Sequence, residues 1–127
     1  MIGRILESAK ILGKKAFLVV TTDGSVVSAV SQSSNSAWMS DRGTAGAAYM
    51  MAFDPAVKPT ATGFQLGHYN TGQGADESFV TGSSPELAAA GIFANYLSYS
   101  GQISKLEGVL PRVFSQEQLN QIIKIYG

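Results

Sequence analysis

The chain has 127 residues, with nine basic and nine acidic side chains, a single histidine and no cysteine. This length fits one domain spanning residues 1–127, and the lack of cysteine excludes disulfide bonds, a thiolate nucleophile and cysteine-ligated metal. Because one histidine also excludes a site that needs two imidazoles from the chain, we expect no metal and no bound cofactor.

The N-terminus predicts an amphipathic helix over residues 2–12, which Gly13 ends. Charged residues interrupt this segment, so it lacks the pattern of a signal peptide. No apolar run approaches the ~20 residues of a membrane span. We therefore expect an intracellular (cytoplasmic) protein, or one carried inside a viral particle, with no membrane partner. The apolar stripe of the helix recurs at helical spacing and consists of Ile2, Ile5, Leu6, Ala9 and Leu12.

The strongest local pattern is a hairpin over residues 16–31. Two β-branched runs flank Asp23 and Gly24, a pair that suits the positive φ angles of a type I′ turn. Both faces of such a ribbon are apolar, so we expect helices or a partner subunit to cover them. The two-residue loop sets the register and places Thr22 opposite Ser25, Val20 opposite Val27 and Leu18 opposite Ala29.

The middle of the chain carries weaker patterns. A polar loop over residues 31–40 contains the only tryptophan, Trp38. Residues 41–53 then predict a short helix from the spacing of their apolar side chains. Residues 63–69 alternate like a strand, with residues 78–81 as the antiparallel mate and a Gly-rich loop between the two.

The C-terminal third predicts two helices. The first spans residues 84–100 and is apolar nearly all round, which indicates a buried helix. In so small a chain, we expect a second copy to supply part of its cover. The second helix spans residues 115–126. Capping-box pairs mark the start of both helices, Ser83 with Glu86 and Ser115 with Gln118.

Together these elements predict a mixed α/β (α+β) single domain. Its mostly antiparallel sheet of about four strands is centred on the hairpin at residues 16–31 and covered by helices. This order of elements, with the turn at residues 22–25, resembles small profilin-like and roadblock-like sensor domains. The resemblance implies a sensor or adaptor function as one alternative.

His68 is the only imidazole and the main candidate for acid–base chemistry. On its predicted strand it shares a face with Phe64 and Leu66, a position typical of a structural histidine. The alternative is a small toxin-type enzyme, a nuclease or transferase, with His68 as the general acid–base. Arg42 and Tyr69 would then stabilise charge.

Phosphate and metal motifs are incomplete. Gly72 and Gly74 are followed by acidic residues and by no helix start, so they lack the context of a phosphate-binding loop. Asp76 and Glu77 are adjacent, whereas a calcium loop needs alternate spacing. We therefore expect flexible glycines and solvated acids in this segment.

Basic residues concentrate near the N-terminus, where they outnumber the acidic Glu7. Binding to phosphates grows with the number of such contacts, so a patch of this size supports only weak, salt-sensitive contact with RNA. The candidate nucleic-acid-binding residues are Arg4, Lys10, Lys14 and Lys15.

Aromatic side chains suited to protein interfaces are frequent, while charged residues make up only 14% of the chain. We therefore expect a non-catalytic interaction or assembly module that self-associates as a homodimer and contacts other protein subunits. The composition also suits a structural or accessory subunit of a larger particle, such as a viral or phage assembly. The residues expected at the interface are Trp38, Phe93, Tyr96, Tyr99 and Tyr126.

Overall fold

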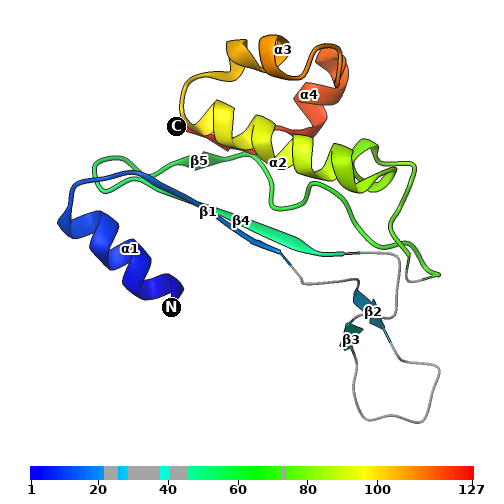
Figure 1. Ribbon diagram of the computed structural model, residues 1–127, viewed down its shortest axis with the longest axis horizontal. Helices are drawn as coiled ribbons and strands as arrows, with labels where there is room; N and C mark the ends of the chain where they lie inside the picture. The colour runs from blue at the N-terminus through cyan, green and yellow to red at the C-terminus, as the bar shows by residue number, and fades with distance from the viewer. Residues whose placement is uncertain (22–25, 29–37, 41–45, 73) are drawn as a thin grey trace.

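A computed structural model describes residues 1–21, 26–28, 38–40, 46–72 and 74–127. They form a mixed α/β domain of helices and short antiparallel strand pairs, which confirms the predicted fold class (Figure 1). In the part of the chain that is described, no helix is long and apolar enough to cross a membrane. In chain order the elements are α1 (Ile2–Ile11), β1 (Ala16–Thr21), β2 (Val26–Ser28), β3 (Trp38–Ser40), β4 (Ala48–Phe53), β5 (Thr60–Ala61), η1 (Val80–Gly82), α2 (Pro85–Tyr99), η2 (Ile103–Lys105), α3 (Leu106–Val109), α4 (Gln116–Ile122) and β6 (Ile125–Tyr126).

The predicted hairpin over residues 16–31 is wrong. β1 pairs antiparallel with β4, so Val20 lies opposite Tyr49. Val27 belongs to β2, which pairs with β3 instead. β4 offers β1 a partner for each of its residues, whereas β2 is only three residues long. Cross-strand side-chain contacts therefore outweigh the local preference of the turn, and the predicted turn at residues 22–25 lies outside the described residues.

Two further predicted elements in the middle of the chain are also wrong. The described part of residues 41–53 forms strand β4, because pairing with β1 overrides a weak helical pattern that contains glycine. Residues 63–69 and 78–81 do not pair as strands. They form a loop that leads into η1, with a single bridge between Tyr69 and Ala75.

The start of α2 lies one residue from its predicted cap. Ser84 is the N-cap, and its Oγ accepts a hydrogen bond from the backbone amide of Leu87 at 3.2 Å. The predicted pairing of Ser83 with Glu86 is therefore wrong. The helix ends as predicted near Gly101, whose φ of 70° is a backbone conformation that glycine adopts readily.

The predicted capping box of the last helix is confirmed. Ser115 and Gln118 each accept a hydrogen bond from the other's backbone amide. The helix is shorter than the predicted span of residues 115–126, however. The last residues of the predicted span form strand β6, which pairs with β5 and places Ile125 opposite Ala61.

The hydrophobic core surrounds α2, which Figure 1 shows between the β1–β4 ribbon and the helices α3 and α4. The core joins α2 to α3 and α4, because buried residues of these three helices pack together. The buried members of the cluster are Ala90, Ala94, Leu97, Leu106, Phe114, Ile122 and Ile123.

Asn95 is a fully buried polar residue within this core. Its Nδ2 donates to the carbonyls of Gly91 and Ile122, at 2.8 and 2.9 Å. Its Oδ1 accepts from the backbone amides of Lys124 and Ile125, at 2.7 and 3.1 Å. The side chain thus satisfies backbone groups that α4 leaves unpaired at its end and fixes the C-terminal segment on α2.

The first half of the chain contributes little to the core. Among residues 1–21, 46–72 and 74–80, only Ala9 is buried. Figure 1 shows α1 and α2 on opposite sides of the β1–β4 ribbon, so the two faces of the ribbon have different surroundings. We call the face toward α2 the inner face and the other the outer face.

Candidate functional site

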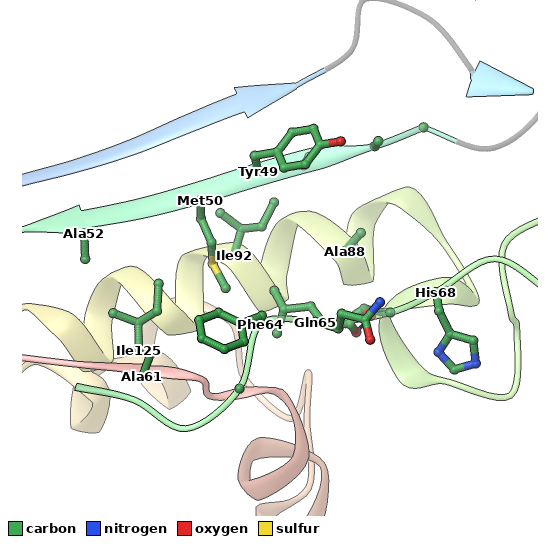
Figure 2. Close-up of a pocket in the computed structure, with 18 of the residues that line it drawn as sticks. Tyr49, Met50, Ala52, Ala61, Phe64, Gln65, His68, Ala88, Ile92 and Ile125 are labelled. Atoms are coloured by element: carbon green, nitrogen blue, oxygen red, sulfur yellow. Dashed lines mark hydrogen bonds between the residues drawn. The ribbon is translucent and has the colours of Figure 1, made fainter. Parts of the chain in front are cut away.

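A cleft of about 630 Å³ lies between the inner face of the ribbon and α2. We call it the inner cleft. Figure 2 shows its walls, which come from β4, from α2 and from the loop that runs from β5 to His68. The side chains that give it an apolar surface include Ala48, Met50, Ala52, Leu66, Ile92 and Ile125.

The alternation of side chains along strand β4 explains why protein side chains do not fill the cleft. Successive side chains of a strand point to opposite faces, so Ala48, Met50 and Ala52 share the inner face. Met50 and Ala52 point toward α2 in Figure 2. The facing turn of α2 presents Ala88. Protein interiors are normally packed without large voids, and alanines on both walls leave this space unfilled.

Two tyrosine hydroxyl groups hold the ribbon at the two ends of the cleft. Tyr99 donates to the carbonyl of Phe53 at 2.5 Å, and Tyr69 donates to the carbonyl of Gly46 at 3.1 Å. Burial raises the pKa of Tyr99, so its hydroxyl group stays protonated and able to donate. Gly46 and Phe53 flank the β4 residues that line the cleft. The two hydrogen bonds therefore fix the position of the ribbon on both sides of the cleft and leave a space between β4 and α2.

Replacing Tyr99 by phenylalanine is expected to lower the free energy of unfolding by about 1–2 kcal/mol, because the Phe53 carbonyl loses its donor while the ring remains. Urea unfolding would measure this change. Tyr96→Phe is the matched control, because within the described ranges this half-exposed side chain of the same helix makes ring contacts with Phe17 and Phe93 and no side-chain hydrogen bond. An equal loss in both variants would contradict the role of the Tyr99 hydroxyl group.

His68 lies at one end of the inner cleft, beside Asp76. The distance from His68 Nε2 to Asp76 Oδ2 is 2.7 Å, and 51% of the His68 side chain is exposed. Ser78 donates to Asp76 Oδ1 from its hydroxyl group and its amide, at 2.6 and 2.9 Å. Hydrogen bonds from Ser78, together with His68, lower the pKa of Asp76. The predicted position of His68 on an apolar strand face is therefore wrong.

The pair should give the loop at residues 68–78 a pH-dependent stability. Since folding lowers the pKa of Asp76 below its ordinary value of 3.8, the carboxylate stabilises the loop above that pH. This contribution is lost as the pH falls through the lowered pKa. Amide exchange of the loop, measured by NMR over an acid titration, should show faster opening at low pH. Asp76→Asn should remove the dependence and Glu77→Gln should retain it.

The structure brings the proposed catalytic residues together only in part. His68 contacts Asp76, which was expected to be a solvated acid and instead bonds to His68 and Ser78. Tyr69 directs its hydroxyl group to a backbone carbonyl. Arg42 lies outside the described residues. The glycine-rich segment was the sequence feature that could have indicated the His68–Asp76 pair. Asn70 Oδ1 accepts hydrogen bonds from the amides of Gly72 and Gly74, and this turn leads the chain back toward His68. No cluster of three metal-ligating side chains occurs in the described ranges.

No protein-family model, curated protein or solved structure matches this chain.

The aromatic residues predicted at an interface have different surroundings. Tyr99 is 4% exposed, and its ring lies 5.8 Å from that of Phe17 on β1. Tyr96 packs between Phe17 and Phe93 and stays half exposed. Tyr126 is half exposed on β6. Trp38 lies on β3, and its side chain is not among those described. The α2 aromatics thus join that helix to the ribbon within the chain.

The basic residues do not form one compact patch. Lys15 Nζ lies 2.9 Å from Asp54 Oδ2, and this hydrogen bond raises the pKa of Lys15. Arg4 and Lys10 are six residues apart on α1, which separates them by roughly 120° around a helix. Lys14 is exposed after the helix end. All four residues are exposed, but Lys15 is paired with Asp54.

Proposed function

We propose that the protein is a non-catalytic assembly module that self-associates through the outer face of its ribbon and α1. The observation that carries this proposal is the apolar surface that α1 and the ribbon expose among the described residues. Ile5 and Leu12 are 44% and 69% exposed, and Val20 and Tyr49 are 41% and 67% exposed. Burying exposed apolar surface of this kind in a contact with a partner is favourable.

Apolar residues in the described part of the chain show where a partner fits. Val20 and Tyr49 lie opposite each other on the outer face of the ribbon, and Tyr49 is 67% exposed. Helix α1 lies on this side of the ribbon in Figure 1. Its residue Ile5 and its C-cap Leu12 are exposed and seven residues apart, which places them on one face of the helix. We call these four side chains the outer surface.

The ribbon itself supports the need for a partner. In the described residues β1 pairs only with β4, and an isolated pair of strands is marginally stable in water. α2 covers part of the inner face through the aromatic contacts of Phe17. A second copy on the outer surface would provide the missing cover and give a symmetric contact, the most frequent kind in homo-oligomers.

The mass of the protein in solution tests the proposal. Light scattering coupled to size exclusion, over a series of protein concentrations, should give a mass above that of one chain. A mass of one chain at every concentration would contradict self-association. A dimer or a larger closed assembly would support self-association. A larger assembly would also favour a role as a subunit of a larger particle.

RNA contact by such an assembly is expected to be weak and electrostatic. Arg4, Lys10 and Lys14 are exposed and repeat in every copy, whereas Lys15 is paired with Asp54. Affinity for a single-stranded RNA should fall at least about tenfold between ~50 and ~200 mM salt, because binding releases counterions. Fluorescence anisotropy would measure this change. Binding that does not depend on salt would contradict the role of these side chains.

A further inference from the structure

We propose that the inner cleft binds a medium-chain aliphatic carboxylate, with the chain between β4 and α2 and the carboxylate beside Lys58. The inference does not rest on self-association. Tyr49 belongs to the outer surface and also borders the cleft, but the alternation of β4 directs its side chain to the outer face, whereas Ala48, Met50 and Ala52 face the cleft. The volume of about 630 Å³ falls within the ~300–1,000 Å³ of small-molecule sites in proteins.

The cleft is built to remain open. Tyr99 and Tyr69 fix the ribbon at Phe53 and Gly46. Between these two points, the inner positions of β4 are two alanines and one methionine. Met50 is flexible enough to adapt to a ligand chain, as methionine does at other adaptable binding surfaces. Apolar surface in such a cleft favours a ligand that removes it from water.

The charge of the lining favours an anionic end group. Among the described residues, no aspartate or glutamate lines the cleft, whereas Lys58 does. The ion pairs of the described residues join Lys15 to Asp54 and His68 to Asp76, so Lys58 has no acidic partner there. An ammonium group beside apolar walls recognises a carboxylate on an aliphatic chain.

The ends of the cleft set the direction of the ligand. Figure 2 places Ala61 and Ile125 at one end and His68 at the other. Lys58 precedes β5, the strand that contains Ala61. His68 is already paired with Asp76, whose negative charge would repel a carboxylate. The carboxylate is therefore assigned to the Lys58 end, and the chain extends past Met50 and Ile92.

Phe64 adds a further apolar surface at the cleft. Its side chain is 98% exposed, although it lines the same space. A bound aliphatic chain would contact this ring and remove part of it from water. The ring thus gives the ligand more apolar contact than the strand and helix provide alone.

Calorimetric titration of the wild-type protein with decanoate, and separately with decanol, tests the charge assignment. Decanoate should bind at one site per chain. Lys58→Gln should weaken decanoate about threefold to fivefold and leave decanol unchanged, since a solvent-accessible ion pair contributes modestly. Lys14→Gln, which removes the same charge elsewhere, should change neither. Equal effects of Lys58→Gln on both probes, or no binding of decanoate, would overturn the proposal.

A matched pair of substitutions on α2 tests the location. Ala88 lines the cleft, and its neighbour Ala89 is exposed to solvent. Ala88→Leu should weaken decanoate at least about tenfold by filling the space, and Ala89→Leu should not. Leucine and alanine both favour helices, so α2 should persist in each variant. If Ala88→Leu instead changes the solution mass and leaves decanoate affinity intact, a second copy occupies the cleft and the proposal is wrong.

Discussion

Asn95→Ala is expected to lower the free energy of unfolding by about 3–4 kcal/mol. The substitution leaves the carbonyl of Ile122 and the amides of Lys124 and Ile125 without partners. Each buried polar group left unpaired costs roughly 1–3 kcal/mol, and water can reach some of these groups at the chain end. Since small domains are stable by only about 5–15 kcal/mol, this loss is a large part of the total.

Urea unfolding followed by circular dichroism would measure the change at a fixed protein concentration. Asn120→Ala is the control, because the side chain of this exposed α4 residue is hydrogen-bonded, among the described residues, only to that of Gln116. Its expected effect is within about 0.5 kcal/mol. Asn95→Asp retains the acceptor for Lys124 and Ile125 but loses both donated bonds, so it should also destabilise. A change below about 1 kcal/mol in Asn95→Ala would show that the C-terminal segment does not depend on this side chain.

The double variant Ile5→Gln, Leu12→Gln is expected to weaken self-association at least about a hundredfold. Burying one such side chain contributes about 1.5–3 kcal/mol, and a symmetric contact contains each side chain twice. A loss of 1.4 kcal/mol corresponds to tenfold in affinity. Sedimentation velocity over a concentration series would then show a single chain where the wild type is associated.

The control for this variant lies on the same helix. The double variant Glu7→Gln, Lys10→Gln changes two exposed polar residues of α1 and leaves the net charge unaltered. It should keep the wild-type mass, and the helical signal of both variants should match that of the wild type. Equal masses for the two double variants would refute the outer surface as the contact.

Local patterns in the sequence predicted α1, α2 and the start of α4, whereas the helix expected over residues 41–53 is wrong. The stripe of α1 and its end at Gly13, whose φ is 62°, follow from short-range spacing and from the freedom of glycine. The capping box of α4 is likewise local, since Ser115 and Gln118 lie within one turn. These signals depend only on neighbours in the chain, so they can be recognised without knowledge of the tertiary contacts.

The strand partners could not be predicted in the same way. β1 is equally compatible with a hairpin to β2 and with pairing to β4, and only the long-range register places Val20 opposite Tyr49. The same applies to the site. The His68–Asp76 pair depends on a loop closed by Asn70, and the anchor from Tyr99 to Phe53 joins residues 46 positions apart.

The sequence by itself determined the mixed α/β class, the bounds of α1 and α2 to within a residue or two, the start of α4, and the scarcity of groups suited to catalysis. It could do so because backbone preferences, capping and composition are properties of short segments. Only the tertiary structure decided which strands pair, where the apolar surface remains exposed, and that a cleft lies beneath β4. Those features depend on the summed contacts of distant segments, and many alternative pairings satisfy the same local pattern.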